Sequence, residues 1–139
     1  MTSCWRDERG SAAVEITMVA PVLVLFILVI IFGGRLALAR QAVQAAAFDA
    51  ARAASLARTQ PDARTAAAAT LANQELPCIT PQLDLDTTGF AKPVGTPATV
   101  TVRLVCDVAT GDLGLPGIAA IVPVDAEATS PLDSFRERK

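Results

Sequence analysis

The sequence contains no histidine and no tyrosine, and only 4% of its 139 residues are aromatic. Without imidazole and phenol side chains, it lacks the commonest general base, the tyrosine acid and the His ligands of metal sites. Its three cysteines are too few to build a zinc site alone, and a Cys or Ser nucleophile would have no imidazole to activate it. The composition therefore predicts no enzyme, no cofactor and no metal site.

An excess of basic residues is also missing, since 12 Lys and Arg stand against 14 Asp and Glu, for a net charge of −2 at pH 7. Proteins that bind nucleic acid normally carry clustered positive charge, so no nucleic-acid partner is expected. Apolar residues, by contrast, make up 52% of the chain, and its mean hydropathy is +0.42. Such a chain is too apolar to be disordered, and the question is where the apolar excess lies.

One segment holds that excess: residues 16–34, ITMVAPVLVLFILVIIFGG, carry no charge and lie between Glu15 and Arg35. As a helix, this stretch is about 28 Å long, close to the thickness of about 30 Å of a bilayer's hydrocarbon core. A soluble protein would have to surround a helix that is apolar on every side, and the rest of the chain is too small for that. The sequence predicts a transmembrane helix over residues 11–35, in which Pro21 is tolerated.

The amino terminus has the layout of a targeting segment, in which a short charged stretch, MTSCWRDERG, is followed by small residues and then by the apolar run. Flanking charge does not set the orientation of the helix. Arg6 and Arg9 on one side are balanced by Arg35 and Arg40 on the other.

The residues Arg9-Gly10-Ser11-Ala12-Ala13-Val14-Glu15, with the apolar run after them, resemble the processing site of type IV prepilins. Residues 10–54 more closely resemble the TadE-like pseudopilins of the tight-adherence (Flp) pilus system. This resemblance extends over about residues 9–57, and more weakly over residues 126–136. Ile16 stands where major Flp pilins often carry an aromatic residue, which favours a minor, pilin-like component.

The resemblance implies a leader, residues 1–10, that a prepilin peptidase removes between Gly10 and Ser11. It implies a single-pass protein of the bacterial inner membrane, with a cytoplasmic amino terminus, an extracytoplasmic domain and an association with the pilus. Its partners would be other pilins or pseudopilins and pilus platform proteins, in a homo- or hetero-oligomer formed through the amino-terminal helix. Glu15 would pair with the new amine at Ser11 of a neighbouring subunit; the alternative is a hydrated Glu15 in the headgroup region.

A second processing signal leads to a different function. The small residues of Ala37-Leu38-Ala39 match a type I signal peptidase site, and cleavage there would leave a protein beginning at Arg40. The apolar run is longer than the 7–15 residues typical of a signal peptide. On this interpretation the chain would be a secreted or anchored binding domain that uses its helix only for export.

Beyond the apolar run, no Gly or Pro occurs between Arg35 and Pro61, so the helix is expected to continue into an extracytoplasmic helical region, residues 36–76. Apolar residues near helical spacing predict its packing face: Leu38, Val43, Ala46, Ala50, Ala53 and Ala57. Pro61 and Asp62 suit a helix's first turn and predict a second helix over residues 61–74.

Residues 77–139 change character and are predicted to form a small β-rich domain. Alternating patterns indicate strands over residues 83–86, 99–108 and 121–128, joined by loops that contain Gly and Pro. Together with the two helices, these strands predict an α+β fold with a small antiparallel sheet laid against the long helix.

The cysteines divide between the two sides of the membrane. Cys4 would leave with the leader, whereas Cys78 and Cys106 lie together on the extracytoplasmic side. An even pair in an oxidising compartment is typical of a disulfide, here closing a loop of about 28 residues and stabilising the fold by about 3 kcal/mol. The alternative is a pair of buried free thiols.

Overall fold

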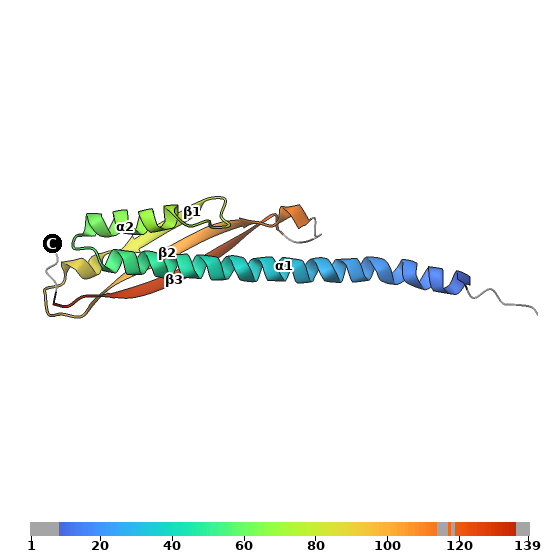
Figure 1. Ribbon diagram of the computed structural model, residues 1–139, viewed down its shortest axis with the longest axis horizontal. Coiled ribbons are helices and arrows are strands. Elements are labelled where there is room, and N and C mark those ends of the chain that lie inside the picture. Colours follow the sequence, from blue (N-terminus) through green and yellow to red (C-terminus); the bar gives the residue numbers. More distant parts are fainter. Residues whose placement is uncertain (1–8, 114–116, 118, 136–139) are drawn as a thin grey trace, which may run out of the picture.

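A single helix, α1 (Arg9–Ser55), forms one long edge of the molecule and extends well beyond the rest of the fold (Figure 1). The computed structural model describes residues 9–113, 117 and 119–135, with side chains from residue 14 onward except that of residue 113. At 1.5 Å per residue, the 47 residues of α1 are about 70 Å long. The helix runs through Pro21 without interruption, and its predicted continuation past Arg35 is confirmed.

The second helix, α2 (Gln60–Ala72), lies back along the carboxyl-terminal part of α1 (Figure 1). Its start follows from its sequence, because the Thr59 hydroxyl accepts a hydrogen bond of 3.2 Å from the backbone N–H of Asp62. Pro61 occupies the first turn, where no backbone donor is needed. The predicted helix over residues 61–74 is thus correct to within two residues at each end.

Three antiparallel strands form the sheet, in the spatial order β1 (Pro81–Asp86), β2 (Ala98–Ala109) and β3 (Ile121–Leu132). Two short 3₁₀ helices, η1 (Thr88–Ala91) and η2 (Gly111–Leu113), lie in the connections. β3 continues four residues beyond the predicted end at residue 128, through Pro131. A proline is tolerated there because β3 is an edge strand. The predicted α+β class is confirmed.

The core lies between one face of the sheet and the two helices (Figure 1). Alternate residues of β2 point into it: Ala98, Val100, Val102, Leu104, Cys106 and Val108. α1 contributes seven buried residues, of which six are alanines and the other is Val43. Such small side chains allow the helix to approach the sheet closely, which explains how a core with few aromatic residues is filled.

The predicted packing face is wrong at Leu38, whose side chain is 68% exposed. Ala53 is only half-buried, as is Ala57, which lies beyond the end of α1. The buried face instead begins at Ala39, which is rotated by about 100° from Leu38 around the helix axis. Both the sheet and α2 cover this side of α1, so the buried face is wider than the single row of residues that the spacing predicted.

Cys78 and Cys106 form a disulfide, with their Cα atoms 5.2 Å apart. Cys78 lies in the segment that leads from α2 to β1, and Cys106 points inward from β2. The backbone N–H of Ile79 also donates a hydrogen bond of 2.9 Å to the carbonyl oxygen of Asp107. This connecting segment is therefore fastened to the sheet at two adjacent points. Cys4 lies outside the described residues.

Because the disulfide closes a loop with a sequence separation of 28 residues, its reduction is expected to lower the free energy of unfolding by about 3 kcal/mol. Urea unfolding of the detergent-solubilised chain, with and without a thiol reductant, measures this loss. A double variant, Cys78→Ala with Cys106→Ala, should show a similar loss and no further response to reductant. An unchanged unfolding midpoint of the native chain on reduction would contradict the prediction.

Candidate functional site

In the described part of the chain, the amino-terminal part of α1 has no buried residue in its most apolar window. From Val14 to Ile31 its large apolar side chains are 44–71% exposed, except that of Leu28, which is half-buried. The most apolar window of 18 residues has a mean hydropathy of 2.9, and none of it is buried. A core helix of a soluble protein would be covered, so this helix has the length, composition and exposure of a membrane span. A signal sequence near the amino terminus has the same properties.

Glu15 lies at the amino-terminal edge of this apolar surface and is exposed. The next described cationic side chain along the helix is Arg35, about 30 Å away at 1.5 Å per residue. Within the described part of the chain, no ion pair involves Glu15. Gly10 and Ser11 lie in the first turn of α1, one to two turns before Glu15, and only their backbone is described.

Arg35, the first residue after the apolar run, joins the helix to the folded domain. Its Nη1 donates a hydrogen bond of 2.6 Å to Oδ2 of Asp112 in η2, so that the connection between β2 and β3 is held at the level of Arg35. This hydrogen bond lowers the pKa of the Asp112 carboxyl, against a smaller opposing effect of burial. The pair was not predicted, although Asp112 is the only charged residue between Asp107 and Asp125.

Two further contacts fasten α1 to β3 beyond this junction. Nε2 of Gln44 donates a hydrogen bond of 3.3 Å to the carbonyl oxygen of Glu127, and Ser130 Oγ donates one of 2.9 Å to Ser55 Oγ. The domain is thus attached along the helix from Arg35 to Ser55, with no flexible linker between the apolar segment and the folded part.

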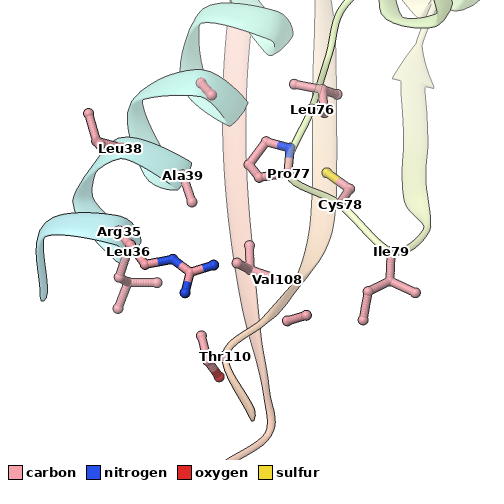
Figure 2. A pocket seen from close by; sticks show the side chains of 12 residues that line it. Arg35, Leu36, Leu38, Ala39, Leu76, Pro77, Cys78, Ile79, Val108 and Thr110 are labelled. Atoms are coloured by element: carbon pink, nitrogen blue, oxygen red, sulfur yellow. The ribbon is translucent and has the colours of Figure 1, made fainter. Parts of the chain in front are cut away.

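A groove of about 600 Å³ lies at the junction, between α1, residues 76–79 and the end of β2 (Figure 2). Its lining is mainly apolar and includes Arg35, Leu38, Pro77, Ile79, Val108 and Thr110. Over the described residues, no three His, Cys, Asp or Glu side chains lie close enough to hold a metal ion. The arrangement can therefore bind apolar groups, and it offers no recognisable set of catalytic side chains.

The sequence model of the TadE-like protein family matches residues 10–52. The resemblance inferred from the sequence is thereby confirmed for the amino-terminal helix, whereas the weaker resemblance of residues 126–136 lies outside the match. No curated protein and no solved structure matches the chain.

Replacing Arg35 by Gln is expected to raise the pKa of Asp112 toward its ordinary range, because the hydrogen bond that lowers it is lost. A ¹³C NMR titration of the carboxyl groups in micelles measures the change. Asp86 serves as the control: a hydrogen bond from the backbone N–H of Thr88 lowers its pKa, and Arg35→Gln leaves that bond intact.

The stability contributed by the pair follows from the sign of this shift. Since the folded-state pKa of Asp112 is depressed, the contribution is present above the unfolded-state pKa and is lost as the pH falls through the lower, folded-state value. The Arg35→Gln variant should lack this loss on the acid side. An identical titration of Asp112 in both proteins would show that the pair does not form in solution.

Proposed function

We propose that this chain, whose amino-terminal helix is TadE-like, is an assembly pseudopilin, a minor pilin-like subunit of a tight-adherence Flp pilus or a related secretion system. The observation that carries the proposal is that the family match, residues 10–52, coincides with α1, the unbroken helix that bears the membrane span. The role is structural rather than catalytic. The chain crosses the inner membrane once, with its amino terminus in the cytoplasm and its folded domain outside.

The proposed processing removes residues 1–10 and leaves Ser11 as the first residue. The span is then residues 11–35, followed by the helical region 36–76 and the β-rich domain 77–139. The family match begins at Gly10, the residue before the proposed cut, which supports this boundary. A prepilin peptidase would perform the cleavage, and pilins, pseudopilins and platform proteins would be the later partners.

Glu15 is proposed to act in assembly. A carboxylate beside hydrocarbon is poorly solvated and requires a partner, and cleavage creates a cationic amine four residues earlier. That amine can pair with Glu15 of its own chain, since positions i and i+4 are neighbours on a helix. It can equally pair with Glu15 of an adjacent subunit, which would set the axial register between two helices. Only the second arrangement makes association depend on the carboxylate.

The alternative function, in which the helix serves only for export, requires cleavage after Ala39. That residue lies inside α1 with a side chain only 4% exposed, packed in the core. A cut there would also separate Arg35 from Asp112, which are joined in the intact chain. This packing favours an α1 that stays whole. Amino-terminal sequencing of the mature protein separates the two functions, because it finds Ser11 for the first and Arg40 for the second.

Replacing Gly10 by Leu is expected to leave a full-length precursor in the membrane, because a side chain there keeps the backbone from approaching the peptidase closely. Mass spectrometry of membrane fractions measures the retained leader. Gly33→Leu is the matched control: a Cβ atom added at Gly33 meets no neighbouring atom within 4 Å, so processing should be normal. Trimming of the Gly10→Leu chain by ten residues would refute the prepilin interpretation.

Replacing Glu15 by Gln is expected to leave insertion and cleavage intact but to abolish co-purification with pilin partners. Gln has nearly the same volume and offers no charge to the Ser11 amine. Glu15→Asp, which retains the charge, should restore part of the association. If Glu15→Gln assembles as well as the native chain, Glu15 pairs within its own chain or is hydrated, and the proposal that it acts in assembly is wrong.

A further inference from the structure

The end of the folded domain nearest the membrane span carries an apolar groove and exposed apolar side chains. We propose that this end is a lipid-contact surface, and that the groove beside Arg35 accepts acyl-chain segments of bilayer phospholipid. The proposal rests on the membrane anchorage stated above and is independent of the role in a pilus.

The level of the groove relative to the bilayer follows from the helix. The apolar run ends at Gly34, and Leu38 lies about 6 Å farther along an unbroken α1. The polar interfacial layer on each side of a bilayer is about 5–7 Å thick. The contact between Arg35 and Asp112 holds η2 at the height of the first residue after the run. The groove therefore begins at the edge of the acyl chains, at Arg35, and reaches outward through the interfacial layer past Leu38.

Three segments each carry an exposed apolar side chain at this end: Leu38 of α1 is 68% exposed, Ile79 is 58% exposed and Ile121 of β3 is 50% exposed. Leu38 and Ile79 both line the groove (Figure 2). Ile121 pairs with Ala109 at the same end of the sheet, and both side chains lie on the face opposite α1. Exposed apolar side chains of this kind mark an interaction site, and Leu38 follows the apolar surface of the span along the same helix.

The charges at the groove favour acyl chains over headgroups. The guanidinium of Arg35 is the cation of its lining, and Asp112 neutralises it. The groove thus offers no unpaired positive charge to a phosphate. A second copy of the chain would have to displace lipid from the interfacial layer to reach the groove, whereas phospholipid is already there.

Quenching of tryptophan fluorescence by brominated lipid tests the proposal on the full-length chain. Trp5 is its only tryptophan, so Trp5→Phe provides a background into which single tryptophans are introduced. The three positions have matched exposure: Val24 in the span is 55% exposed, Ile79 at the groove is 58% exposed and Val94 is 52% exposed. Val94 lies at the opposite end of the domain. There the backbone N–H of Gly95 donates a hydrogen bond to the carbonyl oxygen of Ser134, beyond the end of β3.

In phosphatidylcholine vesicles with brominated acyl chains, tryptophan at positions 24 and 79 should lose most of its emission, and tryptophan at position 94 should lose none. Bromine near the headgroup end of the chain should quench position 79 more than bromine near its terminal methyl group. Adding phosphatidylglycerol should leave quenching at position 79 unchanged. Leu38→Trp gives a second reporter at the groove if Ile79→Trp does not fold.

Each other outcome counts against the proposal in a distinct way. Quenching at position 24 without quenching at positions 79 and 38 overturns the lipid contact and leaves the anchorage intact. Absence of quenching at position 24 overturns the membrane anchorage itself. Emission at position 79 that is unquenched and varies with the ratio of protein to lipid shows that a second copy fills the groove. Quenching that requires phosphatidylglycerol assigns the site to a headgroup rather than to acyl chains.

Discussion

Everything in this molecule depends on α1 remaining one uninterrupted hydrogen-bonded helix through two different surroundings. In hydrocarbon, a helix is stable because its backbone groups bond within the segment and none is left to the lipid. Beyond Gly34 the same helix has one face covered by the sheet and α2. No linker separates the two parts, so the position of the domain relative to the bilayer is set by the helix.

Beyond the apolar run, the packing of α1 against the rest of the domain depends on the small size of its alanine side chains. Six buried alanines on α1 share the core with branched residues of β2, such as Val100, Val102 and Leu104, and the helix can approach the sheet closely. A three-stranded sheet is small, and Phe90 is the one buried aromatic side chain among those described. The disulfide between Cys78 and Cys106 adds stability that this core does not supply by itself.

The junction at Arg35 contributes geometry more than stability. An exposed ion pair adds little to the stability of a fold in water. The side chains of Arg35 and Asp112 are 51% and 58% exposed. The consequence of the pair is positional, because it holds the end of the sheet beside the end of the apolar run. Together with the contacts of Gln44 and Ser55, it attaches the domain to α1 at several points between Arg35 and Ser55. Such an attachment suits the proposed role, in which helices pack in register and carry their domains with them.

Local features of the sequence were sufficient for the exposed apolar helix, its continuation, the α+β class and the approximate strands. Each depends on composition or on a period of two or 3.6 residues, and these act over short distances. The tertiary structure alone decided which side of α1 is buried, since alanine occurs around the whole helix and marks no side. The buried side therefore includes Ala39 and not the neighbouring Leu38 that the spacing predicted. The tertiary structure also decided that β3 continues through Pro131 and that Arg35 meets Asp112, because both depend on pairings between residues far apart in the chain, which no local pattern records.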